Sequence, residues 1–172
     1  MEQLPKELIY PLYTALIMII SFVLIPRKVY KDLFIYGIIF GGIGELIVMS
    51  IAKLLKLGEH IGYGPFGFLS FAFFPPLAWT VWFVMFMYYL PERRALVATY
   101  IISAAIYAVF FSNVLMNLQV FVWYKDRMLI PFIIYAVWFA IAVIGYMRLK
   151  VKPSTFFFFQ AEDGIRDLYV TG

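Results

Sequence analysis

Long apolar stretches separated by short charged ones dominate the chain. A helix needs about 20 mostly apolar residues to cross a bilayer, and the chain offers five stretches of about that length or more. They cover residues 8–25, 33–52, 67–90, 95–123 and 128–147. The gaps between them are charged and too short for soluble domains. The pattern predicts an all-α fold, one bundle of about five transmembrane helices within residues 1–155.

The distribution of Lys and Arg predicts the orientation of this bundle, because short cytoplasmic loops carry an excess of both. One side of the predicted bundle holds eight such residues: Arg27, Lys28, Lys31, Arg93, Arg94, Arg148, Lys150 and Lys152. The opposite side holds five: Lys6, Lys53, Lys56, Lys125 and Arg127. We therefore expect the N-terminus outside and the C-terminus in the cytoplasm.

Composition narrows the function classes. Hydrophobic residues make up 65% of the chain and charged residues 14%, and the mean hydropathy is +0.91. This leaves too little polar surface for a soluble enzyme or a nucleic-acid-binding domain. The chain has no Cys and a single His, which excludes thiolate chemistry and sites that need two imidazoles. We expect a multi-pass protein of the cell membrane, typical of a bacterial inner membrane, with no catalytic set, metal or cofactor.

Glu45 is the most informative residue, because it lies inside the second apolar stretch. A carboxylate at this depth is costly and faces the bundle interior or a cavity. Gly37, Gly41 and Glu45 are four residues apart and share one helix face, where small residues allow close helix packing. Two interpretations stay open: a neutral acid that bridges helices, or a group that titrates during function.

Depth along the predicted helices suggests neighbours for Glu45. At about 1.5 Å per residue, Tyr107, Tyr135, Thr14 and Thr80 fall near the same level of the bilayer. We expect them to form an intramembrane polar site with Glu45. Buried hydroxyl groups also gather in this way simply to satisfy their hydrogen bonds.

Three further features have a structural and a functional interpretation. Asn113 and Asn117 lie one turn apart and predict either interhelical bonding or the wall of an outer pocket. Pro75 and Pro76 predict a kink inside the third stretch, or else mark its start. Arg93 and Arg94 form a turn that sets topology and contacts anionic headgroups.

Two features of the loop after residue 53 are assigned no function. We expect His60, which lies beside Glu59, to be a solvated loop residue. The segment 62–67 matches the letters G-x-G-x-x-G, but a dinucleotide site needs a strand before it and an acid about 20 residues later. Position 87 is Met87, so this segment predicts a flexible turn.

The C-terminal stretch resembles translated DNA rather than a natural tail. Residues 160–167 read QAEDGIRD after a run of four Phe residues. This octapeptide is similar to the translation of a flow-cell adapter oligonucleotide, and residues 170–172 match the start of the next adapter segment. We therefore expect residues 156–172 to be a non-native tail and exclude them from the fold.

The order of several motifs resembles that of a group of small polytopic membrane proteins from spore-forming bacteria. The similarity rests on LIPR at residues 24–27, FPP at 74–76, YYLPERR at 88–94 and the stretch 100–123. It implies a five-helix bundle and carries no known catalytic residues.

Three functions remain open. The first is a non-enzymatic protein that acts through contacts with the bilayer, a second copy of itself or a membrane partner. The second is a small transporter or proton-linked permease that uses Glu45, and the third is an enzyme acting on lipids. We favour the first, because the sequence offers no pair of nucleophile and base.

Overall fold

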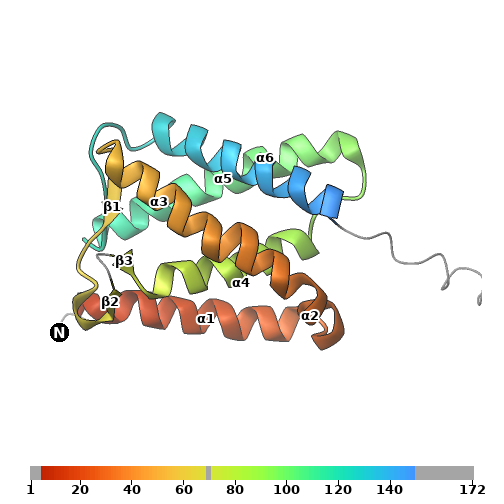
Figure 1. The fold of residues 1–172 in the computed structure, drawn as a ribbon, viewed down its shortest axis with the longest axis horizontal. Coiled ribbons are helices and arrows are strands. Elements are labelled where there is room, and N and C mark those ends of the chain that lie inside the picture. Colours follow the sequence, from red (N-terminus) through yellow and green to blue (C-terminus); the bar gives the residue numbers. More distant parts are fainter. Residues whose placement is uncertain (1–4, 69–70, 150–172) are drawn as a thin grey trace, which may run out of the picture.

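The computed structural model describes residues 5–68 and 71–149, which form an elongated bundle of helices (Figure 1). The helices are α1 (Ile9–Leu24), α2 (Arg27–Tyr36), α3 (Gly44–Leu54), α4 (Phe74–Tyr88), α5 (Arg94–Asn117) and α6 (Leu129–Leu149). The strands are β1 (Gly58–His60), β2 (Gly67–Phe68), β3 (Phe71–Ala72) and β4 (Phe121–Trp123). The tail 156–172, expected to be non-native, lies outside the described residues.

The predicted helical bundle is confirmed. Within the described residues, four helical segments are long and apolar enough to cross a membrane: Lys6–Leu24, Arg27–Leu54, Arg94–Asn117 and Leu129–Leu149. The second runs without a break through α2, a π-helical segment (Gly37–Ile43) and α3. The remaining apolar helix, α4, has 15 residues and is shorter than the predicted stretch 67–90.

The start of α4 decides between the two interpretations of its proline pair. Pro75 and Pro76 lie in the first turn of the helix. A proline there loses no hydrogen bond, since the first amides of a helix have no partner in any case. The predicted kink is therefore wrong, and the alternative, that the prolines mark the helix start, is confirmed. Before Phe74, the strands β2 (Gly67–Phe68) and β3 (Phe71–Ala72) pair with each other instead.

Both α3 and α5 end in the same backbone motif. Lys56 and Gln119 adopt positive φ values of 52° and 58°. After α3, the amide of Leu57 donates to the carbonyl of Ala52, and that of Lys56 to Lys53. The same pair of bonds closes α5 from residues 119 and 120. This is the Schellman motif, and it ends α5 before the predicted boundary at residue 123.

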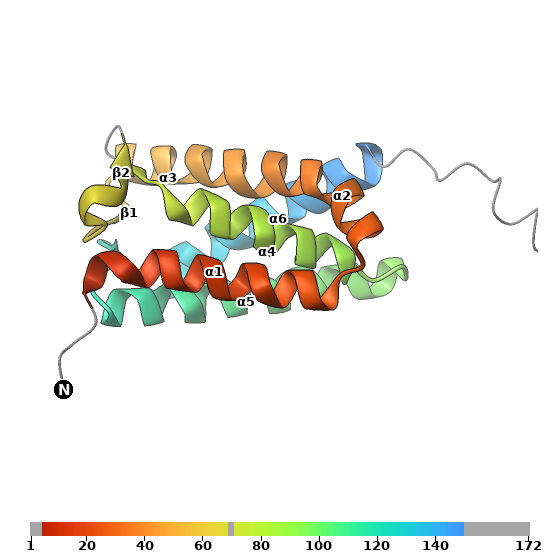
Figure 2. The same ribbon diagram turned by 90° about the horizontal axis from the view of Figure 1, so that it is seen from below.

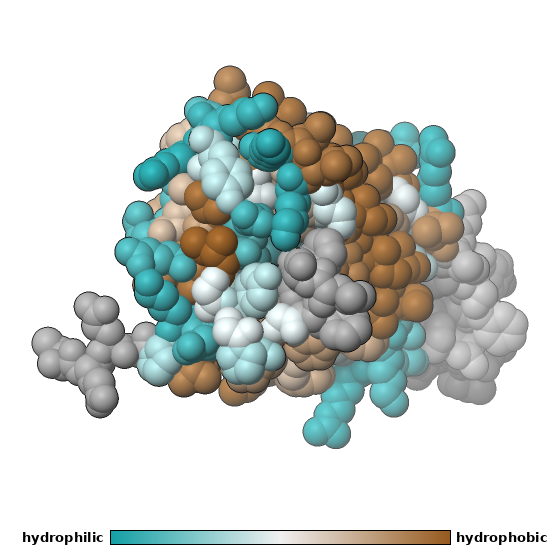
Figure 3. Space-filling model, turned by 60° about the vertical axis from the view of Figure 1, so that its left-hand side comes forward, coloured by the Kyte–Doolittle hydropathy of each residue, from teal (hydrophilic) through white to brown (hydrophobic). Residues whose placement is uncertain are grey.

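The two motifs lead into strands that pair with each other. β1 and β4 are antiparallel, with Gly58 opposite Trp123 and His60 opposite Phe121. We name this end of the bundle the strand end, and the opposite end, with the α1–α2 and α4–α5 connections, the turn end (Figures 1 and 2). Figure 3, which brings the strand end forward, shows hydrophilic side chains gathered around it and a hydrophobic flank behind.

The π-helical segment packs closely on α4, as the glycine spacing predicts. A Cβ atom added to Gly37 would lie 2.6 Å from the carbonyl oxygen of Thr80, and one added to Gly41 would clash with the carbonyl of Trp79. A side chain at either position would hold the two helices apart. This close approach brings Glu45, just after the π-helical segment, into the interior at 2% exposure.

Candidate functional site

A hydrogen bond between Glu45 and His60 forms the centre of the candidate site. Oε1 of Glu45, in the first turn of α3, lies 2.7 Å from Nε2 of His60, at the end of β1. The side chains are 3% and 11% exposed. The interpretation of His60 as a solvated loop residue is therefore wrong. The turn after α3 reverses the chain, so that His60 on β1 packs back against α3.

The other ring nitrogen of His60 extends the chain of hydrogen bonds. Nδ1 lies 2.7 Å from the hydroxyl of Tyr10, on α1, and this hydroxyl donates to the backbone carbonyl of Val120 at 2.8 Å. The chain therefore joins α3, β1, α1 and the segment that leads into β4. Three parts of the chain that are distant in sequence are thus held together at the strand end: α1, the consecutive elements α3 and β1, and the segment before β4.

The geometry fixes where the protons lie in this chain. The Val120 carbonyl can only accept, so the single hydroxyl proton of Tyr10 points to it. The hydroxyl oxygen of Tyr10 then accepts from His60, which places a proton on Nδ1. One further proton lies between Nε2 of His60 and Oε1 of Glu45. The pair is neutral overall, as acid and imidazole or as carboxylate and imidazolium.

The second carboxyl oxygen of Glu45 is exceptional. Oε2 is the only fully buried side-chain nitrogen or oxygen without a hydrogen-bond partner among the described residues. The phenol of Tyr135, on α6, is close enough to Glu45 to interact with it electrostatically. The ring of Phe121 lies across that of His60, with centroids 5.0 Å apart. The acid is thus enclosed, with free acceptor capacity that the surrounding protein does not use.

The structure brings only part of the predicted polar layer near Glu45. Thr14 and Thr80 are buried, but their hydroxyls donate at 2.8 Å to carbonyls of their own helices, those of Tyr10 and Pro76. Tyr135 is buried near the acid, whereas Tyr107 is 50% exposed. Depth along a helix places a residue at a level but does not say which way its side chain faces.

The other candidate residues lie apart from this centre. The Nδ2 atom of Asn113 donates to the carbonyl of Arg127 at 3.0 Å, a bond from α5 to the loop before α6 rather than between two helices, and Asn117 is exposed. Arg93 and Arg94 are exposed at the turn end, where the predicted role in topology remains a prediction.

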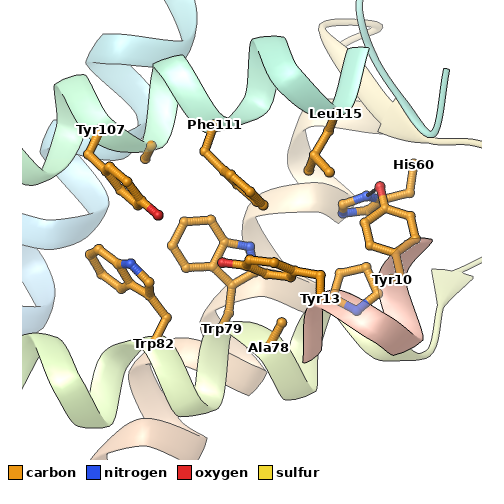
Figure 4. Close-up of a pocket in the computed structure, with 11 residues that line it drawn as sticks. Tyr10, Tyr13, His60, Ala78, Trp79, Trp82, Tyr107, Phe111 and Leu115 are labelled. Carbon is orange, nitrogen blue, oxygen red and sulfur yellow. Dashed lines mark hydrogen bonds between the residues drawn. The ribbon is translucent and has the colours of Figure 1, made fainter. Parts of the chain in front are cut away.

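A cleft begins at Tyr10 and His60 and runs along the bundle between α1, α4 and α5 (Figure 4). Its cavity measures about 30 Å³. Small side chains on two facing helices, Ala78 and Ala108, leave this space, and aromatic rings line most of it. Figure 4 shows Tyr107 and Phe111 on one side and Trp79 and Trp82 on the other.

A second polar cluster lies on the surface of the strand end. The hydroxyl of Tyr124 donates to Oε1 of Glu59, and Nζ of Lys53 lies 3.3 Å from its Oε2. These contacts, the phenol first, hold the pKa of Glu59 below its usual value. The same bond raises the pKa of Tyr124. Glu59 and His60 are neighbours on β1. The acid Glu59 makes its contacts on the surface, whereas His60 contacts the acid Glu45 inside the bundle.

The residues of the candidate site that sequence reasoning missed are His60 and Tyr10. A signal was present: a single His two residues after a glycine, following a helix that carries a buried acid. The Schellman motif that returns the chain has Lys56 rather than Gly at its left-handed position, so the sequence did not indicate the reversal.

Within residues 5–68 and 71–149, no three His, Asp or Glu side chains are close enough together to hold a metal ion. Comparison of the chain with family models, with curated proteins and with solved structures finds no match. The function is therefore argued from the site itself.

Proposed function

We propose that this chain is a non-enzymatic, multi-pass protein of the cell membrane whose strand end responds to protons. All five apolar helical segments cross the bilayer, with the strand end outside and the basic turn end in the cytoplasm. The length and hydropathy of four segments support this, as does the excess of Lys and Arg at the turn end. The protein acts through contacts of its outer strands with a partner.

The observation that carries the proposal is the 2.7 Å contact between the Glu45 carboxyl and His60. The pair is neutral with its one shared proton, which suits a buried position in a bundle with few polar groups. A second proton would turn it into an acid beside an imidazolium, a buried charge without a counterion. Such a charge is costly, so proton uptake favours release of β1 from α3.

The hydrogen-bond chain transmits this release to the surface. His60 holds the Tyr10 hydroxyl, which in turn holds the carbonyl before β4. β1 and β4 are paired, so separation of His60 from Glu45 loosens both strands together. The facing titratable groups are Tyr10 on α1 and Tyr135 on α6, which stay neutral at ordinary pH. The response therefore depends on Glu45 and His60.

A proton-linked permease is the second candidate, and the buried acid favours it. A permease also needs a polar route to the opposite end. Beyond the cleft the interior is filled by stacked rings: the ring centroids of Phe86 and Phe139 each lie 5.0 Å from that of Trp82. This packing favours a local response over passage through the bundle. An enzyme acting on lipids is supported less, because the chain from Glu45 ends on a backbone carbonyl instead of a nucleophile.

The test uses a buried reporter thiol, since the chain has no cysteine of its own. Val120 is 0% exposed, and a Val120→Cys variant in nanodiscs should react with a maleimide only when the strands separate. We expect its labelling, relative to an Ile61→Cys variant in the exposed loop, to increase as the pH is lowered. In the His60→Gln background this pH dependence should be lost, because an amide at this position cannot take up the second proton and no imidazolium forms.

Two outcomes would contradict the proposal. Equal pH dependence with and without the His60→Gln substitution would show that the pair of Glu45 and His60 is not the responding group. Labelling that does not change with pH in either background would reduce the pair to a structural bridge. Glu45→Ala serves as the comparison for a lost bridge: it leaves Nε2 of His60 unpaired, at a cost of about 1–3 kcal/mol, and should raise labelling at every pH.

A further inference from the structure

We infer that the cleft between α1, α4 and α5 is a water-binding site and the route by which protons reach Glu45 and His60. The inference rests on the proposed proton response and adds the path that the protons take to the pair. It starts from position: Tyr10 and His60 line the strand end of this cleft, so the hydrogen-bond chain of the site is one of its walls (Figure 4).

Apart from Tyr10 and His60, the polar groups that line the cleft lack hydrogen-bond partners among the described residues. The hydroxyls of Tyr13 and Tyr107 and the indole N–H groups of Trp79 and Trp82 have no hydrogen-bond partner among the described residues. Figure 4 shows the Tyr107 hydroxyl directed across the cleft toward the indoles. Half-enclosed N–H and O–H groups of this kind are satisfied by water when the space allows it.

The size of the cavity selects the ligand. A volume of about 30 Å³ accommodates one or two water molecules, since each needs about 10–15 Å³ measured in this way. It is too small for an organic ring. The lining contains no Lys, Arg, Asp or Glu, so nothing in it selects an ion. Water that accepts from the indoles and exchanges hydrogen bonds with the phenols fits both observations.

The other approaches to the pair are closed. Phe121 covers one side of the imidazole, and the carboxyl group of Glu45 is enclosed at 3% side-chain exposure. His60 reaches free space where it lines the cleft. A proton carried by water there binds Nε2 of His60 once this atom separates from Glu45. Nδ1 of His60 and the Glu45 carboxyl group keep their own protons, so the pair gains one positive charge.

The single histidine makes the route measurable. In a sample labelled with ¹⁵N at histidine, the imidazole of His60 gives the only such signal, and its exchange with solvent is read directly. Ala108→Leu fills the cleft from α5, and Tyr107→Phe removes one hydroxyl while keeping the ring. The matched control is Ala98→Leu, which adds the same side chain at an exposed position on the same helix.

We expect exchange in Ala108→Leu to be about tenfold slower or more, since it then requires a local opening of the bundle. Tyr107→Phe should slow it severalfold, and Ala98→Leu should leave it unchanged. The Phe variant tests the route even where the Leu variant fails to fold. Unchanged exchange in the folded cleft variants would overturn the inference.

The same spectra separate this inference from the proposed function. The ¹⁵N shifts show whether Nε2 bonds to Glu45. A normal bond with unchanged exchange in the variants means that protons arrive by another path, and the proposed response survives. Shifts that show no bond in the unmodified protein would contradict the proposed function itself.

Discussion

Gly41 lies directly against the backbone of Trp79, close enough that a single added Cβ would clash with the Trp79 carbonyl. Two helices, α4 and the segment before α3, approach each other through this contact. It fixes the depth at which Glu45 enters the interior, four residues further along the chain. The position of the acid is therefore set by a glycine on a neighbouring turn.

Substitution of this glycine tests the helix contact. We expect Gly41→Ala to destabilise the protein by about 1–3 kcal/mol, the usual cost of overpacking, because the clash is with backbone rather than a movable side chain. Thermal unfolding in detergent or nanodiscs measures the effect. Ile43→Ala, at a half-exposed position of the same segment, is the control. A fully stable Gly41→Ala would show that α4 and the π-helical segment are not in contact.

A second prediction concerns the end of α3. Lys56 has a φ of 52°, a conformation that costs an L-residue about 1–2 kcal/mol and glycine very little. Lys56→Gly should therefore stabilise the protein by about 0.5–1 kcal/mol after the greater freedom of glycine in the unfolded chain is counted. Lys56→Ala removes the same side chain and keeps the strain, so it should gain nothing. A loss of stability in the Gly variant would argue against the Schellman turn.

The surface acid gives a prediction with a definite sign. The pKa of Glu59 is lowered, first by the Tyr124 hydroxyl and then by Lys53. A lowered folded pKa adds stability above the unfolded value of about 4.3, and this is lost as the pH falls through the folded pKa. Tyr124→Phe should raise the pKa of Glu59 toward its ordinary value, as followed by carbon NMR of the carboxyl group. Tyr89→Phe, at the turn end, should leave it unchanged.

The orientation in the membrane is tested by labelling introduced cysteines in intact cells. We expect an impermeant thiol reagent to modify Tyr63→Cys, in the loop at the strand end, and to leave Arg93→Cys, at the turn end, unmodified. The excess of basic residues at the turn end is the reason. Modification of position 93 alone would reverse the proposed orientation.

The C-terminal tail is tested at the level of DNA. Amplification of the gene from its source should give a different series of codons after about Thr155 if residues 156–172 derive from an adapter. Recovery of the same codons from genomic DNA would show that the tail is natural.

Hydropathy predicted the helices well because burial in a bundle and burial in a bilayer demand the same thing, a continuous apolar surface. The glycine spacing around Gly41 correctly predicted close packing for the same reason: helical periodicity places residues on faces. Hydropathy could not predict the residues at which the helices end. Val120, Phe121 and Trp123 are as apolar as a helix, yet Gln119 reverses the backbone before them.

Sequence analysis predicted one member of the candidate site, the buried acid, and missed the other, the histidine. A buried acid inside an apolar stretch is recognisable from sequence, because its cost demands a partner. The partner, His60, is fifteen residues away, and its approach depends on a chain reversal at Lys56 that no glycine marks. Tyr107 was predicted from depth alone, and it is half exposed and lines the cleft. Depth along a helix does not tell which way a side chain on α5 points.

The shortness of α4 has a consequence for the bilayer itself. Its 15 residues extend about 22 Å at ~1.5 Å per residue, whereas the hydrocarbon core is about 30 Å thick. In the proposed topology α4 is thus shorter than this core, and the paired strands β2 and β3 before it have backbone groups that lipid cannot solvate. In that topology, the bilayer beside α4 is expected to be thinner, or headgroups and water are expected to replace lipid chains there. Hydrophobic mismatch of this kind favours thin membranes, and the protein is expected to be most stable in short-chain lipids.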